Sequence, residues 1–335
     1  MNGAPFAARR PMVSILIPAF RPTWLDMAIA SALAQTHDDF ELLISDDTAG
    51  DDVQAIVSKW DDPRIRYMRN PLRGQPGANR NHLLAQARGE YLKFLFDDDF
   101  LFPHSLEHLL LTARNAGAKL AFHARHFVDA NGRVLASPSL VKAGTIAVME
   151  PDFFFERLIG ACVNTIGEPT NILLHADTLR AIDGPFDLDG RRMRFLTDVA
   201  LYTNFAARGH VIAGVGYFGS AFRQHGGQAS GQLGPGQSAG YFEWELLRRW
   251  SVDAGHLPRG VYERGTARFA EICRPVLADY PELAPFVAGG AAGLPSTGPA
   301  LDARFLETLA LAYSTIEIRR LATAQACVAA AAVAA

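Results

Sequence analysis

Tyr91-Leu-Lys-Phe-Leu-Phe96 runs directly into Asp97-Asp98-Asp99, an apolar run that ends in three carboxylates. The run before the acids has the length and apolar character of a strand that is buried on both faces. An earlier run has the same form, because Phe40-Glu-Leu-Leu-Ile44 ends at Ser45-Asp46-Asp47. Two apolar strands that each end in carboxylates indicate a sheet with a polar edge for ligands.

Outward from these runs, short apolar segments alternate with segments that have helical spacing. The expected strands are 13–17, 40–44, 64–68 and 91–96, and the expected helices are 23–35, 53–60 and 79–88, the last with Gly89 as its C-cap. This alternation predicts a parallel α/β sheet, in which right-handed crossovers place the carboxyl ends of the strands on one edge. The two acidic clusters are then expected to lie together.

Carboxylates gathered at one edge repel one another unless a cation or hydrogen-bond donors offset their charge. Magnesium and manganese prefer oxygen ligands, and they usually bind through a few carboxylates together with substrate phosphates. The glycine loops that hold phosphates in other folds, GxxxxGK[ST] and GxGxxG after the first strand, are missing from this sequence. The pattern therefore predicts a diphosphate ligand that is held through a divalent metal, manganese or magnesium.

The second part of the chain is less regular. We expect strands at 120–128 and 214–222, with a turn at Asn131-Gly132 and an apolar run at 171–174, and a helix from Leu196 to Arg208 that ends at Gly209. The Gly/Pro/Ser-rich residues 231–240 predict a mobile loop or linker. From Tyr241 onward the pattern is helical, with a break at 288–298.

Composition restricts the class of protein. The 335 residues are 49% hydrophobic and 20% charged, which is typical of a soluble globular protein, and the net charge of −3 gives no case for a nucleic-acid partner. Cys162, Cys273 and Cys327 are too few and too far apart for a disulfide framework or a zinc site. We expect no signal peptide and no transmembrane segment, and hence a cytoplasmic location, free or at the inner face of the membrane.

Several stretches, in order along the chain, resemble the inverting family 2 glycosyltransferases of GT-A fold. The resemblance covers about residues 12–230, and short motifs in a fixed order are much stronger evidence than any one of them. The matching stretches are VSILIPAF at 13–20, IASALAQTHDDFELLISDD at 29–47, Asn79-Arg-Asn81, Gly89–Leu95, Asp97–Asp99, Asp183–Asp187, Thr197-Asp198 and Arg223-Gln-His225.

The resemblance implies an α/β GT-A fold, which has a mostly parallel central sheet flanked by helices. It places the glycosyltransferase domain at residues 1–230, with a nucleotide-sugar half at about 12–120 and an acceptor and catalytic-base half at about 121–230. Residues 231–335 would form a flexible linker and a helical C-terminal extension.

The resemblance also implies residue roles on the donor side. Pro18, Ala19 and Phe20 would line the nucleotide pocket, Asp46 or Asp47 would accept a hydrogen bond from the base, Arg80 would lie near the nucleotide or diphosphate, and Asp97 would face the ribose. The implied metal ligands are Asp98 as the principal one, with Asp99 and His225. Arg223 and His225 would approach the diphosphate on a loop that orders when donor binds.

The implied reaction moves a sugar from a nucleoside-diphosphate-sugar to an acceptor hydroxyl. Asp198 would be the general base that takes the hydroxyl proton, and single displacement would invert the anomeric centre. The acceptor would be a saccharide or a lipid-linked saccharide, as in the synthesis of surface polysaccharides. The sequence leaves open the base and sugar of the donor. It also leaves open whether the C-terminal helices serve homodimerisation, acceptor binding or peripheral membrane contact.

Departures from the family pattern keep other interpretations in view. Arg21 stands where the family often has Asn, Thr48-Ala49 replaces Gly-Ser, Phe96 replaces the first acid of the run, and Thr197 replaces a Glu before the base. One alternative is a degenerate domain that only binds glycans or a partner. Another is a sugar nucleotidyltransferase, although its glycine-rich N-terminal signature is missing. Two of the implied site residues also have a purely structural interpretation. Asp198 could be a helix cap, and His225 could be a structural loop residue.

Overall fold

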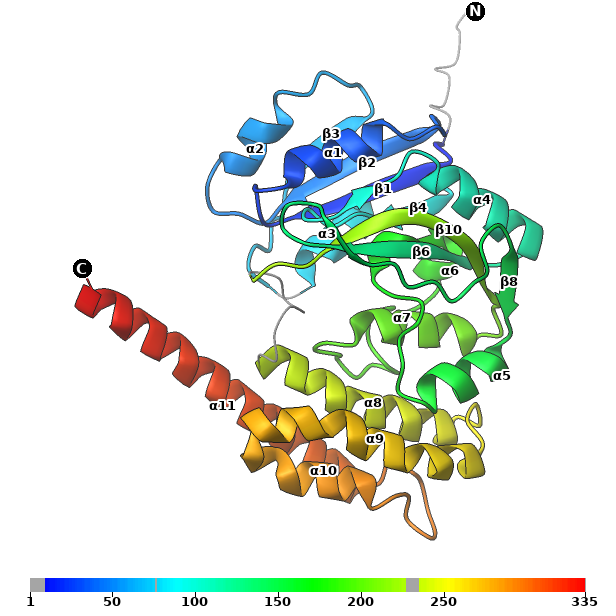
Figure 1. Cartoon of the computed structure of the whole chain (residues 1–335), viewed down its shortest axis with the longest axis vertical. Helices are drawn as coiled ribbons and strands as arrows, with labels where there is room; N and C mark the ends of the chain where they lie inside the picture. Colours follow the sequence, from blue (N-terminus) through cyan, green and yellow to red (C-terminus); the bar gives the residue numbers. More distant parts are fainter. Residues whose placement is uncertain (1–9, 76, 227–234, 335) are drawn as a thin grey trace, which may run out of the picture. The chain divides into compact units, whose positions relative to one another are not determined.

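The computed structural model describes residues 10–75, 77–226 and 235–334 (Figure 1). The chain divides into two compact units. We call the first, residues 1–149, 166–183 and 210–224, the sheet unit, and the second, residues 150–165, 184–209 and 225–335, the helical unit. The division differs from the predicted single boundary near residue 230, because two earlier segments cluster with the C-terminal helices.

The sheet unit is built on one mixed sheet, which has ten strands within the described residues. Their order is β3-β2-β1-β4-β9-β6-β10-β5, with β7 paired to β6 and β8 paired to β10. The strands are β1 (Val13–Ala19), β2 (Phe40–Asp46), β3 (Ile65–Arg69), β4 (Tyr91–Phe94), β5 (Phe100–Leu101), β6 (Leu120–Val128), β7 (Val134–Ala136), β8 (Ile146–Met149), β9 (Ile172–His175) and β10 (Ile212–Arg223).

The first four strands form the parallel half that the sequence predicts. β1 pairs in parallel with β2 on one side and with β4 on the other, and β2 pairs in parallel with β3. The chain therefore reverses its direction of travel across the sheet between β1 and β4, which is the switch point where α/β sheets bind ligands. The other half is mixed, because β9 runs antiparallel between β4 and β6.

Helices cover both faces of the parallel half (Figure 1). Alternate residues of β1, including Ile15 and Ile17, pack in one core with α1 (Leu25–Leu33), α2 (Asp52–Val57) and α4 (Ser105–Ala116). On the opposite face lies α3 (Ala78–Gln86), whose His82 Nδ1 is 3.0 Å from Ser45 Oγ of β2. The short helix α6 (Ala176–Arg180) follows β9. Burial on both faces explains the continuous apolar runs in the sequence.

Gly89 is not the C-cap that the sequence predicts. Helix α3 ends at Gln86, and the cap residue Ala87 is extended. Gly89 lies where the chain approaches β1 closely, since a Cβ at this position would be 2.4 Å from the backbone nitrogen of Ser14. The Gly89 N–H donates to Ser14 Oγ at 2.8 Å. The missing side chain therefore serves a close approach between backbones, which is the other common use of glycine.

The helical unit contains α5 (Pro151–Phe154), a π-helical turn (Phe155–Ile159), α7 (Thr197–Ala206), α8 (Pro235–Asp253), α9 (Arg259–Asp279), α10 (Ala284–Ala291) and α11 (Ala303–Ala334). The predicted linker at 231–240 is wrong from Pro235 onward, because α8 begins there, and proline suits the first turn of a helix. Its earlier residues lie outside the described part. The predicted break falls slightly later, at 292–302.

Charged side chains are buried inside the helical unit where they satisfy one another. The Glu245 carboxylate accepts hydrogen bonds from Arg248, Arg249 and Tyr262, and all three partners come from α8 or α9. Such a network is stable only when each member is paired. None of the helices in the ranges described above is both long and apolar enough to cross a lipid bilayer.

Candidate active site

The carboxyl ends of β1 and β4 are joined by a side chain at the switch point. Asp97 Oδ2 accepts hydrogen bonds from the backbone N–H groups of Phe20 and Arg21, both at 2.6 Å. Burial raises the pKa of Asp97 to about 6, against the effect of these two donors and of the nearby Arg21 charge. Asp97 therefore shapes the loop after β1, and its predicted contact with the ribose stays a prediction.

Asp99 points into the sheet unit and is almost completely buried. Its Oδ2 accepts from Thr170 Oγ1 at 2.6 Å, and its Oδ1 accepts from the backbone N–H of Arg223 at 3.0 Å. Burial and the neighbouring Asp98 charge raise its pKa well above the usual range. Both oxygens are already used inside the protein, so this geometry does not favour the predicted role of Asp99 as a metal ligand.

Lys93, a buried lysine within the apolar run of β4, lies near Asp99. Lys93 Nζ donates to the backbone carbonyl of Thr170, whose hydroxyl binds Asp99. Burial lowers the pKa of Lys93 well below its usual value, and the Asp99 charge opposes this shift. Lys93, Thr170 and Asp99 thus form one internal network under the turn Asp97–Asp99, which we call the acidic turn. Hydrogen bonds to Thr170 satisfy the polar ends of both buried side chains.

Asp98 is the acid of this run that remains accessible. Its side chain is 13% exposed, and its Oδ2 lies 3.7 Å from Nη1 of Arg21, whose side chain is 30% exposed. In the sequence, Arg21 stands out only as a departure from the family pattern. The structure shows that this departure places a fixed positive charge next to the acid predicted as the principal metal ligand. Its position two residues after the end of β1 was the signal that could have identified it.

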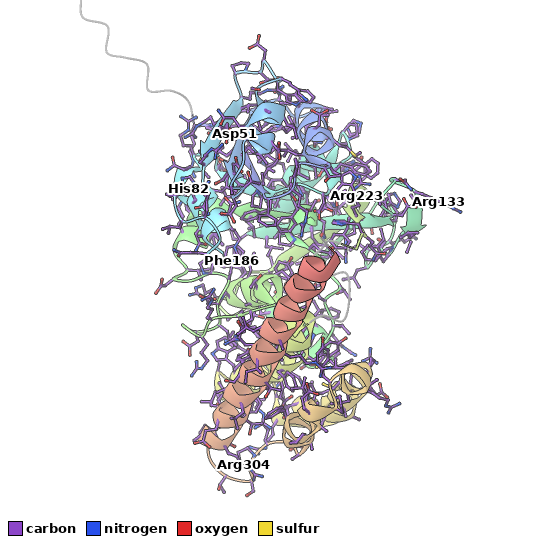
Figure 2. The ribbon with its side chains drawn as sticks, turned by 90° about the vertical axis from the view of Figure 1, so that its left-hand side faces the viewer. Asp51, His82, Arg133, Phe186, Arg223 and Arg304 are labelled. Carbon is purple, nitrogen blue, oxygen red and sulfur yellow. The ribbon has the colours of Figure 1, made fainter. Side chains whose placement is uncertain are left out.

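Arg223 was predicted to approach the diphosphate, and the structure places it inside the sheet unit (Figure 2). Its guanidinium donates to the backbone carbonyls of Asp98, Asp129 and Ala130 at 2.9 to 3.1 Å. The guanidinium also lies 5.1 Å from the ring centroid of Trp24. Burial lowers its pKa, and the charges of the nearby acids oppose this shift. In this arrangement Arg223 holds the backbone of the acidic turn, because one of its partners is the carbonyl of Asp98.

The second acidic cluster also divides into an internal and an accessible acid. Asp46 is fully buried, and its carboxylate accepts from the N–H and hydroxyl of Thr48 and from the hydroxyl of Tyr67, at 2.6 to 2.8 Å. Asp47 is half-buried and accepts from Asn70 Nδ2 at 2.6 Å. Of the two residues predicted to bind the base, the geometry therefore favours Asp47.

The remaining donor-side residues lie around the same edge. Pro18 and Ala19 end β1, with Ala19 fully buried, and Phe20 follows with 57% of its surface exposed. Arg80 lies in the first turn of α3. Asn79, which precedes it, donates to the backbone carbonyls of Ala19 and Ser45 at 3.3 and 2.9 Å. This contact fixes the start of α3 against the ends of β1 and β2.

The predicted general base belongs to the helical unit, in the first turn of α7. Asp198 Oδ2 accepts from Asn164 Nδ2 at 2.8 Å, and its Oδ1 accepts from the backbone N–H of Val199 at 2.8 Å. Asn164 was not singled out in the sequence, and it orients the carboxylate. His225 also belongs to this unit, half-buried after β10. Its predicted roles stay predictions.

The acidic turn offers few protein ligands for a divalent metal. Within the described residues, His, Cys, Asp and Glu do not form a group of three or more that could hold a metal ion. Magnesium and manganese can bind through one or two carboxylates when substrate phosphates complete the shell. The single accessible carboxylate of Asp98 fits that mode, and it does not fit an all-protein metal cage.

Residues 14–180, about half of the chain, match the family model described as Glycosyl transferase family 2. The chain contains a family 2 glycosyltransferase domain. Relatives with curated names agree with this. The chain is 38% identical over 112 residues to "GalNAc(5)-diNAcBac-PP-undecaprenol beta-1,3-glucosyltransferase" of Campylobacter jejuni, an alignment that covers 32% of this chain and 36% of the relative.

Two further relatives are named for polysaccharide synthesis. The "Putative colanic acid biosynthesis glycosyl transferase WcaA" of Escherichia coli K12 is 31% identical over 152 residues, 44% of this chain and 54% of the relative. The "Succinoglycan biosynthesis protein ExoO" of Rhizobium meliloti is 32% identical over 126 residues, 37% of this chain and 36% of the relative. The matches thus span about a third to a half of the length of these relatives. Together with the family match, the names support an enzyme of the glycosyltransferase class.

Solved structures confirm the predicted GT-A fold. S. aureus TarS 1-349 in complex with UDP-GlcNAc aligns with a TM-score of 0.55 and 13% identity, over 91% of each chain. TarS 1-349 in complex with UDP aligns with a TM-score of 0.53 and 16% identity, over 79% of this chain and 72% of that chain. At this identity the likeness shows the fold alone.

Proposed function

We propose that the protein transfers a sugar from a nucleoside-diphosphate-sugar to an acceptor hydroxyl by metal-dependent, inverting single displacement. The observation that supports this most directly is the bridge of Asp97 to the backbone of Phe20 and Arg21. The bridge ties β1 to β4 at the switch point. Phe20 is exposed there, and Arg21 and Asp98 are partly exposed. An aromatic ring, a fixed cation and a carboxylate on one edge suit a base, a diphosphate and its metal.

The donor half of the site has a role for each accessible group. The exposed ring of Phe20 would pack against the base, and the half-buried carboxylate of Asp47 would accept a hydrogen bond from it. Arg21 would lie beside the diphosphate and offset negative charge that develops on the leaving group. A divalent metal bound to Asp98 would supply the remaining positive charge at the departing phosphate.

The acceptor half of the reaction needs a base for a hydroxyl of very high pKa. Asp198 would take that proton, and the Asn164 hydrogen bond would hold its carboxylate in one orientation. Val199 N–H binds the other carboxylate oxygen. Both contacts restrict rotation of the side chain, which favours a positioned base over a mobile surface acid.

The names of similar proteins suggest which substrates to test first. TarS has been solved with UDP and UDP-GlcNAc, so UDP-sugars are our first proposed donors. The Campylobacter jejuni relative is named for an undecaprenol diphosphate glycan, and two others are named for polysaccharides. We therefore propose a lipid-linked saccharide as the acceptor, in the synthesis of a polysaccharide.

The first experiment measures thermal stabilisation by UDP, GDP, dTDP and CDP, each with manganese or with EDTA. A ligand that binds only the folded state raises its stability by mass action. We expect one nucleotide to stabilise the protein with manganese, and we expect the effect to vanish with EDTA and in Asp98→Ala. Asp61→Ala is the matched control, because Asp61 is an exposed acid after α2. If no nucleotide stabilises the protein, the proposed donor site is wrong.

A second experiment tests the reaction. Asp198→Asn should keep the stabilisation by nucleotide and lose sugar transfer, because the base acts on the acceptor and not on the donor. The anomeric configuration of the product, read by NMR, should be opposite to that of the donor. Retention of configuration would exclude single displacement, and full activity of Asp198→Asn would exclude this residue as the base.

A further inference from the structure

A long exposed segment crosses between two strands of the sheet unit. Residues 133–148, RVLASPSLVKAGTIAV, contain β7 and β8, and every residue except Val141 is exposed. We call this segment the strap. Figure 2 shows Arg133, its first residue, at the outer margin of the sheet unit. Five large apolar side chains of the strap are each 40 to 54% exposed: Val134, Leu135, Leu140, Ile146 and Val148.

The exposure does not come from a loose loop, because the strap is held at both ends and in the middle. β7 pairs with the end of β6, and β8 pairs with the start of β10. Between them, a Cβ placed on Gly214 would lie 2.8 Å from Val141, and one on Gly216 would lie 1.9 Å from the carbonyl oxygen of Lys142. These two glycines of β10 let the strap backbone lie directly on the sheet.

The charge of the strap has one sign. Residues 130–149 contain no Asp or Glu, and their two charged side chains, Arg133 and Lys142, are both exposed. The nearest acids in the sequence are Asp129 and Glu150, at the two ends. Asp129 already accepts backbone hydrogen bonds from Asn131 and Arg133 at 2.9 Å. Apolar side chains interleaved with cations and free of acids match the chemistry of an anionic lipid surface.

We propose that the strap docks this enzyme on an anionic membrane surface. Its five apolar side chains would enter the interfacial layer, while Arg133 and Lys142 would lie among the lipid phosphates. Large exposed apolar groups that gather on one fixed segment commonly mark an interaction site. The charge pattern favours a lipid surface as the partner of the strap. On a bilayer, apolar groups that enter the surface are surrounded by lipid phosphates, which attract Arg133 and Lys142 and would repel acids. The proposal goes beyond sugar transfer and does not depend on it.

The test is flotation of the full chain with vesicles, without nucleotide or metal. We expect binding to vesicles that contain phosphatidylglycerol, weaker binding to pure phosphatidylcholine, and a decrease with added salt, since salt screens the attraction. Leu135→Ser with Ile146→Ser should weaken binding roughly tenfold or more, because less apolar surface is buried in lipid. Arg133→Ser with Lys142→Ser should weaken it by about fivefold per charge on anionic vesicles alone.

Leu72→Ser with Leu111→Ser provides the matched control, because these two leucines are 53% and 52% exposed and lie outside the strap. This variant should bind vesicles like the unaltered protein. Equal losses in the control and strap variants, or no binding by the unaltered protein, would overturn the proposal. A concentration-dependent dimer that only the strap variants lose would assign the surface to a second copy of the chain and would overturn it too. Thermal midpoints close to that of the unaltered protein show that each variant is folded.

Discussion

The Glu243 carboxylate accepts a hydrogen bond from the backbone N–H of Leu196 at 2.6 Å. It also accepts from the N–H groups of Arg194 and Phe195, at 2.5 and 3.0 Å. Leu196 is the N-cap of α7, so a buried side chain of α8 fixes the start of the helix that carries Asp198. The C-terminal helices therefore take part in positioning the proposed base.

Glu243→Ala should lower both stability and transfer. The change leaves three backbone N–H groups without their acceptor, and each unsatisfied buried group costs about 1–3 kcal/mol. We expect a loss of several kcal/mol in urea unfolding and a reduced kcat, with an unchanged KM for the donor. Tyr313→Phe is the control, because it removes a single hydrogen bond to Glu243, at 3.2 Å. Equal effects of the two variants would show that the backbone contacts do not matter.

Asp98 and Asp99 are adjacent in sequence, yet their substitutions should affect different properties. Asp99→Asn should lower stability, and Asp98→Asn should abolish binding of nucleotide with metal. Asp99→Asn replaces one of two buried acceptor oxygens by an amide NH2 group. Either the Thr170 hydroxyl or the Arg223 N–H then loses its acceptor, which typically costs about 1–3 kcal/mol. Asp98→Asn should leave stability nearly unchanged and abolish the stabilisation by nucleotide with manganese. Chemical denaturation measures the loss of stability in Asp99→Asn, and thermal shift with nucleotide and manganese measures the loss of binding in Asp98→Asn. Loss of metal-dependent binding in a fully stable Asp99→Asn would restore Asp99 as a ligand.

Arg21 should compete with a metal for Asp98. Its guanidinium lies 3.7 Å from the Asp98 carboxylate, and removing a nearby positive charge favours binding of a cation. Arg21→Met should therefore tighten manganese binding without nucleotide by about 1 kcal/mol, or about fivefold, for partly screened charges. Arg21→Lys keeps the charge and should change the affinity little. Calorimetric titration with manganese measures both variants, and weaker binding by Arg21→Met would contradict this reading.

The sequence predicted the parallel half of the fold well, because strands buried on both faces give continuous apolar runs. The predicted strands at 13–17 and 40–44 match the starts of β1 and β2, and the end of β4 lies two residues before the predicted one. Topology then places both acidic clusters at one edge. β9 was less visible, since its direction depends on pairing with β4 and β6 across long stretches of chain.

The sequence could not show which acids face the ligand. Asp97 turns inward because two backbone N–H groups of the loop after β1 lie within hydrogen-bond distance. Asp99 turns inward because the Thr170 hydroxyl, which is far along the chain, lies within hydrogen-bond distance. These partners meet only in the folded chain. The role of Glu243 could not be predicted either, because its three hydrogen-bond donors are backbone N–H groups, which every residue type except proline has. Local spacing carries no signal for contacts of this kind.

His123 should make the protein sensitive to acid. It lies fully buried on β6, with Nε2 2.8 Å from Ser105 Oγ. Burial lowers its pKa well below the usual value of 6.5, and the charge of Lys93 lowers it further. The unfolded chain therefore binds a proton at a pH where the folded protein does not. Stability is unaffected above about pH 6.5, and it falls as the pH decreases toward the folded pKa, by up to about 1.4 kcal/mol per pH unit.

His123→Gln tests this prediction, because glutamine can still meet Ser105 and does not titrate. The variant is expected to lose stability at neutral pH through imperfect packing, yet its free energy of unfolding should fall less steeply between pH 6.5 and 4.5. Other histidines with lowered pKa values, such as His126 and His175, contribute equally to both proteins, so the difference in slope isolates His123. His126→Gln, at a more exposed site, should change the slope less. Urea unfolding at several pH values measures the slope of the unfolding free energy against pH for each protein. Identical slopes for His123→Gln and the unaltered protein would mean that His123 does not protonate on unfolding.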